Sequence, residues 1–239
     1  MNVFAKPFVK PFVVNAPENV SVPVQGRSGR FPVRRIYCVG RNYADHIREM
    51  GGDERELPFF FQKPTDALLT DGAEVPYPSL TNDFQHEVEL VLAIGREAAQ
   101  IAPEEAAAHV FACGVGIDLT RRDVQVQARQ TGRPWEIGKS FDHSAPCGDL
   151  VPLQGRLPGR GRIELEVNGS TRQQGDLAQM IWSCSEIVSE LSKQYRLFPG
   201  DLIYTGTPAG VGPLVPGDRV LARIHGLPEL RIRIGERRP

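Results

Sequence analysis

The chain lacks the features that mark membrane and nucleic-acid-binding proteins. No stretch of its 239 residues approaches the roughly 18 consecutive apolar residues of a membrane-spanning helix. An excess of one charge is also missing, because 28 basic residues face 29 acidic ones and the net charge is −1. Neither nucleic acid nor a membrane surface is therefore an expected partner. Hydrophobic residues make up 41% of the chain, which is ordinary for a globular protein with a sizeable core.

Cysteine is scarce and widely spaced. The four cysteines, Cys38, Cys113, Cys147 and Cys184, form no C-x-x-C motif, so neither a disulfide framework nor a zinc cluster is expected. Free thiols are typical of a reducing compartment, which favours the cytoplasm. The first 14 residues are interrupted by lysine and proline, so we do not expect a signal peptide there.

Apolar runs and turn residues predict more strands than helices. Strands are expected over 34–40, 59–64, 86–95, 114–119, 163–168 and 202–205, and residues 70–83 are expected to form a loop. Single helices are expected over 103–113, 120–132 and 183–195, the second opening on a T-x-x-D signal and the third on a Ser183/Glu186 capping box. Helices that occur singly between strands favour an α+β fold with a mixed, rolled sheet. We divide the chain into an N-terminal arm (1–30) and one domain (31–239).

The most informative stretch is His86-Glu87-Val88-Glu89-Leu90, which continues into a β-branched apolar run. Such a run predicts a strand that is buried on both faces. Side chains two apart on a strand point the same way, so Glu87 and Glu89 should project together. Two carboxylates that are this close together and partly removed from water are unfavourable unless a cation lies between them. The alternative is a pair of solvated acids at the edge of a strand.

Asp118 ends the next predicted strand and offers a third carboxylate. Three carboxylates without cysteine suit Mg²⁺ or Mn²⁺ better than Zn²⁺, because hard cations prefer oxygen ligands. The alternative is an aspartate that only begins a turn.

Three further features could carry chemistry. His46 and Glu49 are three residues apart on a predicted helical turn, where a carboxylate could orient an imidazole that activates water. Lys139 has apolar neighbours and could stabilise a developing negative charge. The segment 205–212 is rich in glycine and threonine, as in loops that bind anions, but it lacks the G-K-[ST] of a P-loop. The alternatives are an exposed surface pair for His46 and Glu49, a surface lysine for Lys139 and a plain tight turn for 205–212.

Taken together, the motifs resemble those of the fumarylacetoacetate hydrolase family. The matching strings, in the family's order, are YCVGRNY (37–43), the His46/Glu49 pair, FQKP (61–64), HEVEL (86–90), GIDLTRRD (116–123), GKSF (138–141) and TGTPAGVG (205–212). The resemblance covers about residues 31–220. It implies a mixed β-roll or β-sandwich of that family's C-terminal type with a few short helices, and a homodimer with Mg²⁺ or Mn²⁺ at its site.

The resemblance also implies residue roles. Glu87, Glu89 and Asp118 would be the metal ligands, and His46, Glu49 and Lys139 would be catalytic. Substrate-binding roles are implied for Arg41, Arg121, Gln125 and Thr207.

Within the family, the strings FFFQKPTDA (59–67), RPW (133–135) and QMIWS (179–183) are most similar to fumarylpyruvate hydrolases. The implied reaction is hydrolysis of the carbon–carbon bond of an acylpyruvate, giving fumarate and pyruvate in aromatic catabolism. Decarboxylation of oxaloacetate or another 2-oxo acid, and general acylpyruvase activity, are alternatives that share these motifs. A metal-stabilised protein without catalytic activity would need the three acids but not His46 and Lys139.

Overall fold

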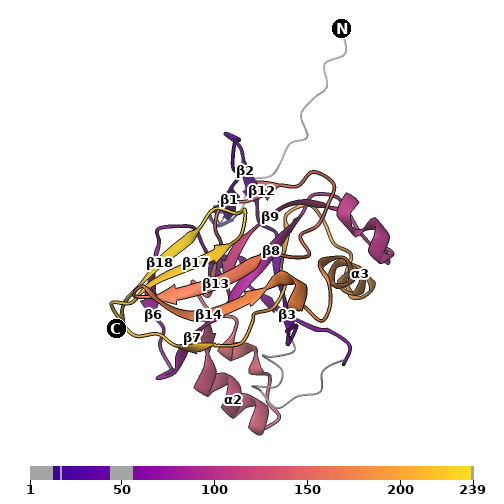
Figure 1. Ribbon diagram of the computed structural model, residues 1–239. Coiled ribbons are helices and arrows are strands. Elements are labelled where there is room, and N and C mark those ends of the chain that lie inside the picture. Colours follow the sequence, from indigo (N-terminus) through magenta and orange to yellow (C-terminus); the bar gives the residue numbers. More distant parts are fainter. Residues whose placement is uncertain (1–12, 17, 44–55, 238–239) are drawn as a thin grey trace.

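The computed structural model describes residues 13–16, 18–43 and 56–237 (Figure 1). Its central sheet has six strands in the order β12 (Val151–Pro152), β9 (Val110–Ile117), β8 (Val88–Ile94), β15 (Asp201–Tyr204), β3 (Arg35–Gly40) and β4 (Phe59–Lys63). Strand β15 runs parallel to β3 and antiparallel to β8, so the sheet is mixed. The predicted α+β class with a mixed sheet is confirmed.

A second sheet packs against this one. It has five strands, β14 (Ser170–Asp176), β13 (Arg162–Val167), β17 (Arg219–Ile224), β18 (Leu230–Arg237) and β6 (Glu74–Tyr77). In Figure 1 the strands β13 and β14 lie in front of β8 and β9. Leu90 and Leu92 of β8 share a core cluster with Ile163 and Leu165 of β13, whereas Val91, on the other face of β8, packs in a second cluster. Strand β8 is thus buried on both faces, as predicted.

Smaller sheets complete the roll. One contains β10 (Thr120–Arg121), β7 (Phe84–His86) and β16 (Gly212–Pro213), and another pairs β11 (Ala145–Pro146) with β5 (Leu68–Leu69). Near the N-terminus, β1 (Ser21–Pro23) pairs with β2 (Arg30–Pro32), and Val22 and Phe31 of this pair join the core.

Helices are short and lie around the sheets. Among the described residues, the α-helices are α2 (Arg122–Gln130) and α3 (Cys184–Gln194), which lie well apart in Figure 1. The 3-10 turns are η1 (Thr65–Ala67), η2 (Pro103–Ala108), η3 (Trp135–Gly138) and η4 (Leu177–Gln179). The predicted capping box of α3 is confirmed, because Ser183 and Glu186 each bond the other's backbone N–H.

Three expectations about local structure are wrong. The helix expected over 103–113 stops at Ala108, and Val110 already begins β9. The loop expected over 70–83 contains strand β6, which pairs in parallel with β18. The T-x-x-D signal does not cap α2, since the N-cap residue Arg121 makes no side-chain cap and Asp123 instead accepts a bond from the backbone N–H of Asn82.

Two further expectations concern cellular setting. Within the described ranges, the structure contains no helix long and apolar enough to cross a bilayer. The four cysteines are all buried and free.

Candidate active site

The three predicted acids meet where the central sheet and the small β7 sheet join. Glu87 lies between β7 and β8, Glu89 lies in β8 opposite Gly116 of β9, and Asp118 follows β9. The backbone N–H of Asp118 donates to the Glu87 carbonyl over 2.8 Å, which fixes the two strand ends together. One carboxylate oxygen from each acid lies within 4.8 Å of the others, and the residues are only 6%, 1% and 1% exposed. This all-oxygen set fits a hard divalent cation.

Three cationic side chains contact this acid cluster, which we define as Glu87, Glu89 and Asp118. The Lys139 ammonium lies between Glu87 Oε2 (2.9 Å) and Asp118 Oδ2 (2.8 Å). Lys63 lies 2.8 Å from Asp118 Oδ1, and Arg122 pairs with the other oxygen of Glu87. Buried charges persist when each has a close partner. These ion pairs compensate Glu87 and Asp118, whereas among the described residues Glu89 forms no ion pair with a basic side chain.

Burial shifts the ionisation of the cluster. Burial raises the pKa of Glu89 well above its usual value, and the charges of Asp118 and Glu87 raise it further. A bond of 2.7 Å from the Gly206 N–H to Glu89 Oε2 opposes that rise. For Lys139, burial alone would lower the pKa, but the charges of Asp118 and Glu87 outweigh burial and raise it. Lys139 is therefore held protonated beside the carboxylates.

Turn η3 positions Lys139. The residue follows Gly138, and its backbone N–H donates to the Glu136 carbonyl over 2.7 Å. Gly138 lies so close to α2 that a Cβ there would be 2.6 Å from Gln125 Cβ and 2.9 Å from Gln125 N. Glycine is thus required for η3 to approach the helix closely enough to bring the ammonium to the acids.

The loop after β15 was expected to resemble an anion-binding loop. The group that its Gly206 N–H binds is the carboxylate of Glu89, within the same chain. Gly206 has φ of +94°, and a Cβ there would be 2.6 Å from Asn42 Cβ, so only glycine fits. Thr207 is 2% exposed, and its hydroxyl accepts a bond of 2.8 Å from Gln173 Nε2. Gln173 Oε1 in turn accepts from the Val88 N–H, so one amide ties this loop to the start of β8.

The acid cluster opens into a cavity of about 300 Å³. The residues that line it are Val39, Gly40, Arg41, Phe59, Phe61, Glu87, Glu89, Asp118, Arg122, Gln125, Arg129, Trp135, Lys139 and Thr207. Seven of the predicted site residues are therefore brought together. Arg121 is not among the lining residues, because its guanidinium lies 4.2 Å from the ring centre of Phe141. His46 and Glu49 lie outside the described residues.

The sequence reading missed four features of the cavity. Lys63 and Arg122 were part of quoted strings, but neither was given a role at the acids. The aromatic wall formed by Phe59, Phe61 and Trp135 lies in strings that resemble fumarylpyruvate hydrolases, but it was given no role at the cavity, and Arg129 lies in none of the quoted strings. A helical wheel would have indicated Arg122 and Arg129, because they lie three residues before and four residues after Gln125 on one face of α2.

Known proteins share this architecture and sequence. Residues 35–235 match the family model described as fumarylacetoacetate (FAA) hydrolase C-terminal. The chain belongs to the fumarylacetoacetate hydrolase family. A fumarylpyruvate hydrolase of a Ralstonia species is 43% identical over 180 residues, which are 75% of this chain and 94% of that protein. An oxaloacetate tautomerase of Escherichia coli K12 is 40% identical over 204 residues, covering 84% of this chain and 93% of that protein.

A solved structure of the family is also similar throughout. The fumarylpyruvate hydrolase from Pseudomonas aeruginosa, crystallised in complex with Mn²⁺ and pyruvate, superposes with a TM-score of 0.92 at 50% sequence identity. The match covers 95% of this chain and 100% of that one. The expectation of an enzyme, a hydrolase that acts on carbon–carbon bonds, is confirmed by the family and these relatives.

Proposed function

We propose that the protein is a metal-dependent acylpyruvate hydrolase that cleaves fumarylpyruvate to fumarate and pyruvate. The observation that carries the proposal is the buried acid cluster at the base of a cavity whose other walls are cationic and aromatic. Such a cavity suits a substrate with acidic groups and a flat unsaturated chain. The P. aeruginosa relative, crystallised with Mn²⁺ and pyruvate, supports both the metal and the pyruvoyl end of the substrate.

Glu87, Glu89 and Asp118 would hold Mg²⁺ or Mn²⁺. When bound, such a cation polarises substrate oxygens and stabilises negative charge. The chain's own groups would do the rest of the binding. Arg122 is fixed by a bond of 2.7 Å to Gln125 Oε1, so it presents a planar, permanently charged donor at the edge of the acid cluster. Thr207 adds a hydroxyl to the cavity lining, held by Gln173.

Lys139 is the proposed group that stabilises charge on the reacting carbonyl. Its ammonium is buried, 3% exposed for the whole residue, and its raised pKa keeps it a donor throughout the neutral range. A preorganised cation in a site that excludes water stabilises a developing oxyanion far better than water does. Lys63 also supports the position of Lys139, because its ammonium donates to the Lys139 carbonyl.

His46 and Glu49 are the proposed water-activating pair. His46, oriented by Glu49, would take a proton from the attacking water, which would add to the carbonyl remote from the pyruvoyl group. The carbon–carbon bond would then break and release pyruvate. Arg41, Gln125 and Thr207 are the proposed substrate contacts.

Oxaloacetate chemistry is the second candidate, favoured by the 40% identical tautomerase of E. coli. It would use the acid cluster and Lys139 but would need no attacking water. We also propose that the protein is cytoplasmic and that it forms a homodimer; light scattering of the purified protein would test the dimer.

A substrate panel separates the candidates. Purified enzyme with Mg²⁺ or Mn²⁺ should release pyruvate from fumarylpyruvate far faster than it decarboxylates or tautomerises oxaloacetate. His46→Ala should reduce hydrolysis of fumarylpyruvate by at least about a hundredfold, the usual contribution of a positioned general base. Its effect on any oxaloacetate reaction should be much smaller. Rapid turnover of oxaloacetate without release of pyruvate from any acylpyruvate would overturn the proposal.

A further inference from the structure

Arg129 has no role in the proposed chemistry, and Arg41 is a proposed substrate contact that has not been matched to any group of the substrate. Arg122, Arg41 and Arg129 all line the cavity, and only Arg122 pairs with the acid cluster. The three acids are opposed by Lys63, Lys139 and Arg122, so their formal charges are already matched. Within the described ranges, neither Arg41 nor Arg129 forms an ion pair with an acidic side chain. A bound divalent cation would make the cavity more positive still.

Helix α2 places Arg129 at a distance from the acids. Arg122, Gln125 and Arg129 occupy positions i, i+3 and i+7, which lie on one face of a helix. At a rise of about 1.5 Å per residue, Arg129 lies roughly 10 Å farther along the helix axis than Arg122. Among the described residues, the cavity therefore combines the acid cluster and its paired cations with further positive charge that lies farther along α2.

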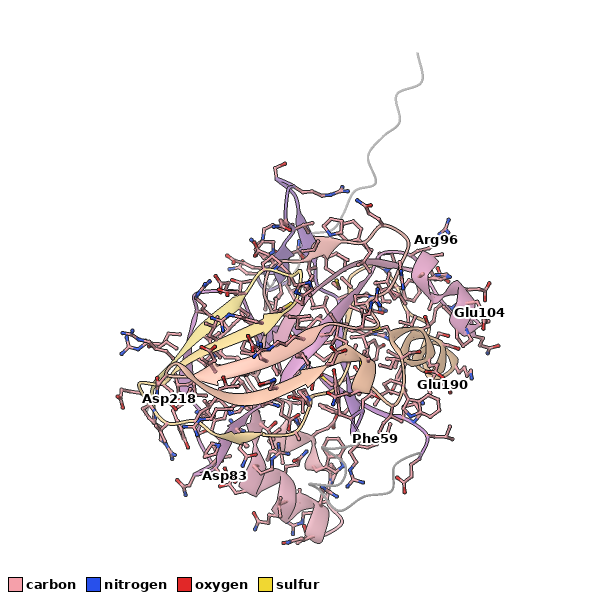
Figure 2. All side chains as sticks on the ribbon, in the orientation of Figure 1. Phe59, Asp83, Arg96, Glu104, Glu190 and Asp218 are labelled. Atoms are coloured by element: carbon pink, nitrogen blue, oxygen red, sulfur yellow. The ribbon has the colours of Figure 1, made fainter. Side chains whose placement is uncertain are left out.

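Another wall of the cavity is aromatic. Trp135 meets Phe61 and Phe59 edge to face, with ring centres 5.2 and 6.0 Å apart (Phe59 is labelled in Figure 2). These rings offer a flat apolar surface but no acceptor that could neutralise an arginine. A ligand that satisfies the whole cavity has acidic groups at both ends and an apolar, planar middle.

The charges around Arg129, an exposed residue that also lines the cavity, are consistent with this conclusion. Burial lowers the pKa of Arg129, and the charges of Arg41 and Arg122 lower it further. Arg41 also has φ of 57°, a left-handed conformation that non-glycine residues seldom adopt and that is typical of functional sites. An anion between Arg41 and Arg129 would relieve the repulsion.

We infer that Arg129, together with Arg41, binds the distal carboxylate of the substrate and so selects dicarboxylic acylpyruvates over monocarboxylic ones. The inference rests on the proposed function and names the substrate class that the site accepts. Arg129 is a specificity residue in this account, because it lies away from the bond that breaks.

The kinetic test compares fumarylpyruvate with acetylpyruvate, which lacks the distal carboxylate. Arg129→Gln should lower kcat/KM for fumarylpyruvate at least tenfold more than for acetylpyruvate, the usual scale for loss of a charge-assisted hydrogen bond. Most of the change should be in KM. Arg133→Gln removes an exposed charge that does not line the cavity, so it controls for general attraction of anions and should leave the ratio unchanged. Equal losses on both substrates in Arg129→Gln would overturn the inference while leaving hydrolysis established.

A binding measurement keeps the inference testable if neither substrate is hydrolysed. Calorimetric titration with fumarate and with crotonate, in which a methyl group replaces one carboxylate, uses two ligands of nearly equal shape. The wild-type protein with Mn²⁺ should bind fumarate more tightly, and Arg129→Gln or Arg41→Gln should remove that preference. If the wild-type protein binds fumarate and crotonate equally tightly, the distal subsite is refuted. If it prefers fumarate but hydrolyses neither acylpyruvate, the proposed reaction is refuted and the distal subsite stands.

Discussion

Replacement of Lys139 by methionine tests the electrostatics of the acid cluster. The ammonium lies 2.9 Å from Glu87 and 2.8 Å from Asp118, and its removal leaves two buried carboxylates with one partner fewer. Breaking a buried ion pair costs about 3–5 kcal/mol, because the remaining charge has lost its compensation. Glu87 keeps Arg122 and Asp118 keeps Lys63, so the lower figure of about 3 kcal/mol applies. For a chain of this length that corresponds to a fall in Tm of about 6–12 °C.

The assay is thermal unfolding in EDTA and then in Mn²⁺. Lys139→Met should melt about 6–12 °C below the wild-type protein in EDTA. A saturating divalent cation should restore much of the loss, because a ligand that binds only the folded state stabilises it. Lys193→Met is the matched control, since it breaks an exposed pair with Glu190 that should contribute less than about 1 kcal/mol. A Lys139→Met variant as stable as the wild-type protein in EDTA would refute the reasoning.

Two other predictions follow from burial and packing. Burial raises the pKa of Cys147 and of Cys184 to about 12 and that of Cys113 to about 11, so at pH 8 these thiols are protonated and inaccessible. Ellman's reagent should therefore modify none of the four cysteines of the native protein and all four after denaturation. Rapid labelling of the native protein would contradict the buried positions of the cysteines. Gly138→Ala should cost about 1–3 kcal/mol and lower kcat, because the new methyl group would push η3 and Lys139 away from Gln125; unchanged kcat and unchanged Tm would show that η3 does not position the lysine.

Local patterns in the sequence predict the elements whose signals are local. The run from Val88 to Ile94 is apolar at every position, and it is a strand buried on both faces. The Ser183/Glu186 box marks the start of α3 because capping depends on neighbouring residues alone. The clustering of Glu87, Glu89 and Asp118 also follows from local pattern, since β8 and β9 are adjacent in the chain and pair antiparallel.

The failures share a physical cause, which is pairing between distant segments. The alanines of 106–108 favour a helix. The helix nevertheless ends early, because Val110–Ile117 forms the strand that pairs with both β8 and β12 in the central sheet. Strand β6 contains Pro76, which is typical of a loop, but it is an edge strand that pairs with residues of β18 about 160 positions later. The sequence does not distinguish the two neighbouring arginines, Arg121 and Arg122. The position at which α2 begins determines that Arg122 lines the cavity whereas Arg121 packs on Phe141.

Calorimetric titration with Mn²⁺ measures directly whether Glu87, Glu89 and Asp118 together hold one divalent cation. We expect the wild-type protein to bind one equivalent of Mn²⁺ per chain. Glu89→Gln, which keeps the shape of the side chain and removes its charge, should abolish that binding while the protein remains folded. Absence of binding to the wild-type protein, or equal binding to folded Glu89→Gln, would contradict the account.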